Sequence, residues 1–297
     1  HWQSRGLGDV YKRQAISYDF SEYLSDVNQV HYRVVDGSGE ITTDLPIVLN
    51  SKPMIHDCAI TNNYVLIFDL PVTFNTSRRN KDENASDYPV VWDDNYSSRL
   101  GLLNRNTNEI KWIEVPNCFL FHVVNSYEDS SGKVILDFCR YDKLFDFNNP
   151  LPFGKKPFLT RWEIDTIKET CVEKLLDDRP MEFARIHPDL EGKEYRFSYI
   201  LNDGALNNLF KYDFLKDRNE VHHLGEHKKG AEPVFIPKID QTSEDSGYVV
   251  GFVYDQEVDK SEFIIIDAEN FSEEPLARIQ LPSRVPFGFH GSWINLD

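Results

Sequence analysis

Hydrophobic residues along the chain gather in short runs rather than in long stretches of helical period. Four of these runs are rich in β-branched and aromatic side chains: NYVLIFDL (63–70), KVILDFCRY (133–141), GYVVGFVYD (247–255) and EFIIIDAEN (262–270). Short runs of this composition, bounded by polar residues, are typical of strands. The pattern therefore predicts a chain built mainly of β-strands.

Turn signals between the apolar runs indicate how the strands connect. Clusters of Gly, Asn and Asp at DGSGE (36–40), RNTNE (105–109) and DQEVDKSE (255–262) suit hairpins. A modest helical period occurs only in KETCVEKLLDD (168–178). Many hairpins with few helices favour a sandwich, a barrel or a propeller, and the repeated strand groups favour the propeller among these.

The first residues differ in origin from the rest of the chain. The stretch DVYKRQ (9–14) is the translation of GAT GTG TAT AAG AGA CAG, which belongs to the transposase mosaic end of a common sequencing adapter, and SRGLG (4–8) is the translation of the bases upstream. We predict that residues 1–14 are adapter read-through and not native. Residues 15–297 are then expected to form the C-terminal majority of a single all-β domain, with polar insertions at 76–89 and 143–158 as loops.

Composition supports a large globular core and excludes some partners. The chain is 40% hydrophobic and 13% aromatic, and its formal net charge is −17. The read-through segment carries three basic residues and one acidic residue, so its removal makes the charge more negative. Phosphate backbones and strongly anionic membranes both require clustered basic charge. The charge therefore argues against nucleic acid as a partner and against a strongly anionic membrane surface.

The cysteine pattern and the hydropathy are typical of a protein from a reducing compartment. Cys58, Cys118, Cys139 and Cys171 are far apart and form no CxxC pair, so buried reduced thiols are expected rather than a zinc or redox site. No apolar run approaches the roughly 20 residues of a membrane-spanning helix. A cytoplasmic location is expected.

Three of the nine histidines share an unusual context. His56 (PMIHDCAIT), His122 (CFLFHVVNSYED) and His290 (VPFGFHGSW) each follow an apolar residue in a segment that looks buried. A single histidine of this kind is usually a hydrogen-bonded core residue. Three of them at the ends of separate strands, brought together on a propeller axis, suit a transition metal, because neutral imidazoles are good ligands for such ions.

The segments around these histidines resemble a known family. PMIHDCAITNNYVLIFDLPV, FHVVNSYED and VPFGFHGSW are similar to successive histidine motifs of the carotenoid cleavage oxygenase family, which includes carotenoid, apocarotenoid and lignostilbene dioxygenases. Further similar segments follow in order: RLGLLNR (99–105), MEFARIHPDLEGKEYRFSYI (181–200), EPVFIPK (232–238) and DSGYVVGFVYD (245–255). The resemblance implies a seven-bladed β-propeller with a ferrous iron on its axis, held by four histidines. The propeller is expected to be incomplete in this chain, because the N-terminal blades are absent.

The resemblance also implies which residues form the site. His56, His122 and His290 match the second, third and fourth ligands, and the first is expected upstream of Tyr18, outside this chain. Glu182 and Glu232 match glutamates that hydrogen-bond to ligand histidines, an arrangement that fixes the tautomer of the imidazole. A third such glutamate is likewise expected outside the chain.

Residues near the motifs have less specific expectations. Phe289 and Trp293 are expected to wall the substrate cavity, although core packing explains them equally well. For Asp57, Asn125 and Glu128 a role in holding the strand ends is favoured over direct chemistry. The remaining native histidines, which are His31, His187, His222, His223 and His227, are expected to have solvent or core roles.

The implied chemistry is oxidative cleavage of a conjugated carbon–carbon double bond. Fe²⁺ is the expected cofactor, O₂ and a small apolar or phenolic conjugated molecule are the expected substrates, and two carbonyl compounds are the products. The polar loop at 76–89 favours an apocarotenoid or a stilbene over a full-length carotene, whereas FDFNNPLPFGKKPF (145–158) could contact a membrane peripherally. The chain alone is expected to be inactive. The alternative hypothesis is a propeller without metal that serves as a binding or interaction module.

Overall fold

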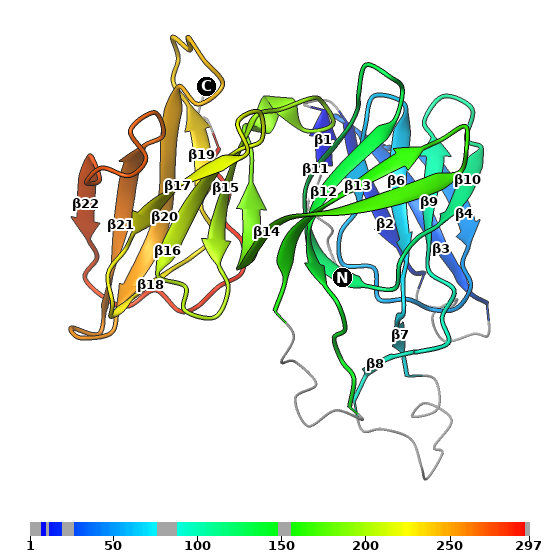
Figure 1. Cartoon of the computed structure of the whole chain (residues 1–297), viewed down its shortest axis with the longest axis horizontal. Helices are drawn as coiled ribbons and strands as arrows, with labels where there is room; N and C mark the ends of the chain where they lie inside the picture. The colour runs from blue at the N-terminus through cyan, green and yellow to red at the C-terminus, as the bar shows by residue number, and fades with distance from the viewer. Residues whose placement is uncertain (1–6, 10–11, 20–26, 76–87, 148–155, 295–297) are drawn as a thin grey trace. The chain divides into compact units, whose positions relative to one another are not determined.

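The structure is a computed structural model that describes residues 7–9, 12–19, 27–75, 88–147 and 156–294. Contacts divide the chain into unit 1 (His1–Lys155 and Thr160–Lys174) and unit 2 (Lys156–Leu159 and Leu175–Asp297). The described residues of both units are built almost entirely of antiparallel strands (Figure 1). The all-β prediction is confirmed.

The described residues of unit 1 form two four-stranded antiparallel sheets, a short strand pair and the beginning of a further sheet. The first sheet has the order β1-β2-β3-β4, from β1 (Leu7–Asp9), β2 (Lys12–Ser17), β3 (Gln29–Asp36) and β4 (Ile41–Val48). The second has the order β10-β9-β6-β5, from β5 (Ala59–Ile60), β6 (Tyr64–Asp69), β9 (Arg99–Asn104) and β10 (Ile110–Glu114). Strands β7 (Val72–Phe74) and β8 (Val90–Trp92) pair, and β11 (Phe119–Glu128), β12 (Val134–Tyr141) and β13 (Phe158–Asp165) lead to β14 (Thr170–Arg185).

The burial of both faces of strand β6 explains why its sequence is continuously apolar. Successive side chains of a strand point to opposite faces of the sheet. Val65 and Ile67 lie in a buried cluster with residues of β3, such as Val30. Leu66 and Phe68, on the other face, lie in a second cluster that includes residues of β12 and β13. Both faces of β6 are therefore covered, and neither requires polar residues.

Unit 2 continues from β14 into two more antiparallel groups. Strand β14 pairs with β15 (Phe197–Asn202), which is followed by β16 (Asn208–Asp213) and β17 (Arg218–His223). The other group has the order β18-β20-β21-β22, with β19 also on β20: β18 (Lys228–Gly230), β19 (Val234–Pro237), β20 (Gly247–Asp255), β21 (Lys260–Asp267) and β22 (Ala277–Gln280). A 3-10 helix, Pro188–Leu190, follows β14. The core of unit 2 includes Tyr199, Phe235 and Phe271.

Three predicted hairpins are confirmed, whereas the segment with a modest helical period forms a strand. Residues 36–40, 105–109 and 255–262 form the turns or adjoining strand ends of β3–β4, β9–β10 and β20–β21. Residues 170–178 of the expected helical segment lie in β14. Ladder bonds to neighbouring strands outweigh a modest local helical preference, and Val172 and Leu175 are left exposed. Most of the two expected loops, at 76–87 and 148–155, falls outside the described residues.

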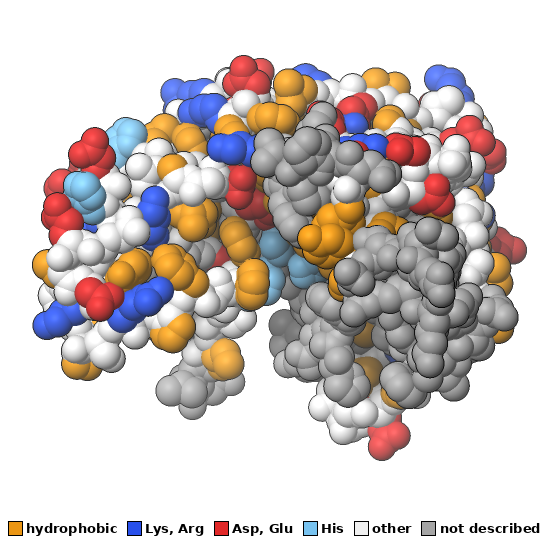
Figure 2. All heavy atoms as spheres, turned by 90° about the horizontal axis from the view of Figure 1, so that it is seen from below, with side chains coloured by type: hydrophobic (Ala, Val, Ile, Leu, Met, Phe, Trp, Pro, Cys, Tyr) orange, Lys and Arg blue, Asp and Glu red, His pale blue; other side chains and the backbone are white. Residues whose placement is uncertain are grey.

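The structure also describes residues 12–14, the four cysteines and the distribution of charged side chains on one face. Lys12–Gln14 belong to β2 and pair with β3, which leaves their predicted adapter origin a prediction. All four cysteines are thiols, three of them buried and Cys171 half-buried. Among the described residues no helix is long and apolar enough to cross a membrane. Figure 2 shows basic side chains interspersed with acidic and apolar ones on the face that it draws.

Candidate functional site

Two of the predicted metal ligands lie together in unit 1. His56 is in the segment before β5, and His122 is a buried residue of β11. The centroids of their rings are 5.3 Å apart, and the ring planes are inclined by 56°. The ring of Phe121 also packs edge-to-face against His56, with the ring centroids 5.1 Å apart. The structure thus places two imidazoles side by side from segments that are 66 positions apart.

Asp57 holds the two histidine segments together. Its carboxylate accepts hydrogen bonds from the backbone N–H of Cys58 (2.8 Å) and of Val123 (2.9 Å). Val123 directly follows His122, and the register of β11 shifts on both sides of Val123. The bond from Val123 therefore ties the His56 segment to an irregular part of β11, which supports the structural role favoured for Asp57.

Glu128 forms hydrogen bonds to a neighbouring turn, and Asn125 is buried within β11. Glu128 accepts hydrogen bonds from the Thr61 hydroxyl and from both the backbone N–H (3.1 Å) and the side-chain Nδ2 (2.8 Å) of Asn63, so it secures the turn before β6. Asn125 is buried in β11 opposite Asp137 of β12. These bonds support the structural role favoured for Glu128, and its choice over direct chemistry stays a prediction.

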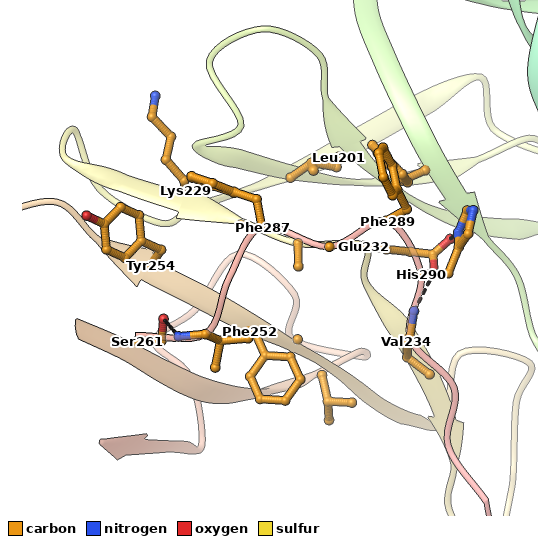
Figure 3. A pocket seen from close by; sticks show the side chains of 18 of the residues that line it. Leu201, Lys229, Glu232, Val234, Phe252, Tyr254, Ser261, Phe287, Phe289 and His290 are labelled. Carbon is orange, nitrogen blue, oxygen red and sulfur yellow. Dashed lines mark hydrogen bonds and ion pairs between the residues drawn. The ribbon is translucent and has the colours of Figure 1, made fainter. Parts of the chain in front are cut away.

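In unit 2, the third predicted ligand lies beside a predicted glutamate. His290 Nδ1 is 3.2 Å from Glu232 Oε1, and the Glu232 side chain is 1% exposed. Figure 3 shows the two side chains adjacent at one end of a pocket. A ring that donates its Nδ1–H to a carboxylate keeps the lone pair of Nε2 for another partner. This arrangement is chemically suited to a metal-ligating histidine.

Arg185, which no motif indicated as a site residue, forms a hydrogen bond to the carboxylate of Glu232. Its Nη2 donates to Glu232 Oε2 (2.9 Å) and to the carbonyl oxygen of Gly291 (2.8 Å). The N–H of Gly291 donates to the same Oε2 (3.0 Å). The only sequence signal for Arg185 was its position three residues after Glu182 in MEFARI.

Glu182 lies at a distorted point of β14. Its Oε2 accepts a hydrogen bond from the N–H of Phe183 (2.8 Å), and its side chain is buried. Phe183 has φ +58°, a left-handed conformation that costs a non-glycine residue energy and is often found at functional sites. The Phe183 ring meets His290 edge-on, with centroids 5.9 Å apart. Burial, followed by the nearby Glu182 carboxylate, raises the pKa of Asp203.

A largely apolar pocket of about 380 Å³ adjoins His290. Both predicted cavity residues, Phe289 and Trp293, line it, and they are 77% and 54% exposed. Phe252 and Phe287 lie along its length, and Tyr254 and Ser261 lie at the end away from His290 (Figure 3). The use of this pocket for a substrate stays a prediction.

The other histidines have ordinary partners. The ring nitrogens bond or pair as follows: His31 with Asp44, His187 with Asp189 N–H, His222 with the carbonyl of Phe271, His223 with Asn208, and His227 with Glu257. Burial lowers the pKa of His222, which favours its neutral form. These contacts are compatible with solvent and core roles, which stay predictions.

The donors fit a transition metal by their chemistry, although the described residues contain no preassembled cluster. Over the parts of the chain that the structure describes, no three His, Cys, Asp or Glu side chains are grouped to hold a metal ion. His56 and His122 belong to unit 1 and His290 to unit 2. Neutral imidazoles, one of them oriented by a buried carboxylate, are suitable ligands for iron.

Comparison with known proteins shows the family. Residues 13–295 match the family model for retinal pigment epithelial membrane protein (RPE65), and the chain belongs to this family of carotenoid cleavage oxygenases. It is 28% identical to a carotenoid cleavage oxygenase of Mycobacterium tuberculosis, over 94% of this chain and 65% of that protein. It is 31% identical to a carotenoid 9,10(9',10')-cleavage dioxygenase of Crocus sativus, over 99% of this chain and 60% of that protein.

A solved structure confirms the fold class. Cobalt-substituted Synechocystis ACO, an apocarotenoid oxygenase, is similar with a TM-score of 0.84 and 25% identity, over 96% of this chain and 61% of that chain. The β-propeller prediction is therefore confirmed. The chain spans 60–65% of the lengths of these relatives.

Proposed function

We propose that this chain is part of an iron(II)-dependent oxygenase that cleaves a conjugated carbon–carbon double bond into two carbonyl products. The observation that carries the proposal is the contact of His290 Nδ1 with the buried carboxylate of Glu232, since a carboxylate beside Nδ1 favours the tautomer whose lone pair is on Nε2, as a metal-ligating histidine requires. Family membership supports the reaction class, since relatives are named carotenoid cleavage oxygenases and dioxygenases.

His56, His122 and His290 would hold the iron, and Glu232 would orient His290. Bound ferrous iron would supply the position at which O₂ is activated. The structure of Synechocystis ACO in cobalt-substituted form supports a metal site in that relative. The protein side chains then bind and orient the alkene and keep the site dry, and no side chain is needed as a general acid or base.

The substrate is proposed to be a carotenoid, an apocarotenoid or a stilbene. The pocket beside His290 is lined mainly by apolar side chains, among them Phe252, Phe287 and Phe289. Long conjugated alkenes gain their binding energy chiefly from the burial of apolar surface. The charged residues of the 76–89 segment favour the shorter and more soluble members of this group.

The test uses the protein extended by its native upstream sequence, purified, and supplied with iron(II). We expect about one iron per chain and O₂-dependent conversion of an apocarotenoid or a stilbene into two carbonyl compounds, identified by mass spectrometry. H56A, H122A and H290A should each lose iron and activity. H223A is the matched control, because His223 bonds to Asn208 at the surface of unit 2.

The iron content and the cleavage activity of the extended protein decide whether the oxygenase proposal fails. If the extended wild-type protein holds no iron after careful reconstitution and cleaves none of these alkenes, the oxygenase proposal is wrong. That result would favour the alternative of a metal-free binding module.

A further inference from the structure

The two oxygens of Glu232 have separate partners. Oε2 accepts hydrogen bonds from Arg185 Nη2 (2.9 Å) and from the N–H of Gly291 (3.0 Å). Oε1 is the oxygen that lies 3.2 Å from His290 Nδ1. A carboxylate whose second oxygen is held by two donors cannot rotate freely, so the direction of Oε1 is set by the bonds to Oε2.

Arg185 closes a ring of hydrogen bonds around this carboxylate. Besides Glu232, its Nη2 donates to the carbonyl oxygen of Gly291 (2.8 Å), so one nitrogen binds both the carboxylate and the backbone that follows His290. The contact joins positions 106 residues apart. Arg185 therefore fixes both sides of the His290–Glu232 contact: the carboxylate and the turn that carries the imidazole.

A β-bulge brings Arg185 to this place. Glu182 pairs with Leu201 and Arg185 with Tyr199, so three steps along β14 correspond to two steps along β15. In a regular strand, residues three apart point to opposite faces. The extra residue resets the alternation, and Glu182 and Arg185 occupy the same face of the sheet.

We infer that Arg185 is a positioning residue, which orients Glu232 so that the carboxylate holds the proton of His290 on Nδ1 and leaves Nε2 unprotonated. The inference deepens the proposed function, since it rests on His290 being a metal ligand. It assigns Arg185 no contact with the substrate and no contact with the metal. Its direct consequence is a defined tautomer of His290, which exists before any metal binds.

The experiment reads this tautomer in the metal-free chain. The protein is labelled with ¹⁵N, and the imidazole nitrogens of His290 are assigned by their loss in H290Q and followed in long-range ¹H–¹⁵N spectra at a pH where the ring is neutral. The wild type should show Nδ1 protonated. In R185M the ratio of the Nδ1–H to the Nε2–H form should fall about tenfold, the loss expected for one charge-assisted hydrogen bond.

Two further variants separate positioning from general damage. R185K should lie between the wild type and R185M, because both bonds of Arg185 come from one nitrogen and an ammonium group also carries several donors. R196M removes another arginine–carboxylate pair of unit 2, with Asp213, and should leave the His290 tautomer unchanged. If folded R185M or R185K keeps the wild-type tautomer, or R196M shifts it equally, the inference is wrong.

A titration with Co²⁺ distinguishes this inference from the proposed function. The extended protein, with its upstream sequence, should bind Co²⁺ with a ligand-field absorption spectrum, and R185M should bind it 10- to 100-fold more weakly. A tautomer shift in R185M together with no Co²⁺ binding by the wild type would overturn the metal proposal and leave the positioning role intact. An unchanged tautomer in R185M together with normal Co²⁺ binding by the wild type would overturn the positioning role and leave the metal proposal intact.

Discussion

At the scale of single residues, buried carboxylates organise both the candidate site and the stability of the fold. Asp57 connects the His56 segment to β11, and Glu232 connects Arg185 to the His290 turn. Asp69, which is fully buried, accepts from Arg99 (2.7 Å) and from the hydroxyl of Tyr96. Each carboxylate joins segments that are distant in the sequence.

Asp213 provides a prediction on pH. Two hydrogen bonds from Arg196 (2.9 and 2.7 Å) hold the pKa of Asp213 below its ordinary value of 3.8. Because the folded pKa is below the unfolded one, this pair stabilises the folded state fully above about pH 4, and the stabilisation is lost as the pH falls through the folded pKa. We expect the free energy of unfolding, measured with urea, to fall between pH 4 and pH 2, and D213N to show a smaller fall.

The difference between the two curves isolates Asp213. Asp245 and Glu262 also have lowered pKa values from nearby lysines, so D213N should keep part of the acid slope. Parallel curves for the wild type and D213N over this range would contradict the assignment.

Sequence motifs indicated some residues of the candidate site and missed another. His290 and Glu232 were selected from the sequence through their motifs, and the structure brings them within 3.2 Å. Arg185 was not selected, because an isolated arginine in a strand carries no signal of its partner. Its role depends on a carboxylate and a backbone carbonyl that approach it only in the folded chain.

At the scale of elements, strand alternation accounts for most of what could be predicted. The runs at 63–70, 133–141 and 247–255 all contain strands, and β6 shows why such runs can be apolar throughout. The segment 168–178 has a modest helical period but forms a strand, in which residues 170–178 are exposed or half-buried and none is fully buried. Local preference was weak there, and pairing with neighbouring strands decided the outcome.

Leu66 tests the two-sided burial of β6. L66A should lower the free energy of unfolding by about 2–5 kcal/mol, since the removed side chain is fully buried and leaves a cavity. L66M should cost less than about 1.5 kcal/mol because it nearly conserves volume. L175A, at an exposed leucine of β14, should change stability by less than about 0.5 kcal/mol. Urea denaturation measures all three, and a cost for L175A equal to that of L66A would contradict the burial of these strands.

At the scale of the whole molecule, charge limits the partners. The net charge is −17, and the basic side chains are interspersed with acidic ones on the face drawn in Figure 2. A net charge this negative, with basic side chains mixed among acidic ones where the described residues are drawn, disfavours a phosphate backbone as a partner.

This charge predicts chromatographic behaviour. At pH 7 and about 0.15 M salt, where screening acts over about 8 Å, the chain should pass through heparin. It should be retained by a quaternary-ammonium resin at low salt. A version lacking residues 1–14 should behave in the same way, because those residues carry net positive charge. Retention on heparin, or a shift of duplex DNA in a gel, would contradict the prediction that nucleic acid is not a partner.

By itself, the sequence determined the strand content, the hairpins and the family, because alternation, turn residues and motifs are local properties of the chain. It also identified the histidines and glutamates of the candidate site. Only the tertiary structure decided that the rings of His56 and His122 lie close together, that β14 is a strand with a bulge, and that Arg185 meets Glu232 and Gly291. These outcomes depend on strand register and on contacts between segments up to 106 residues apart, and such contacts leave no periodic trace in the sequence.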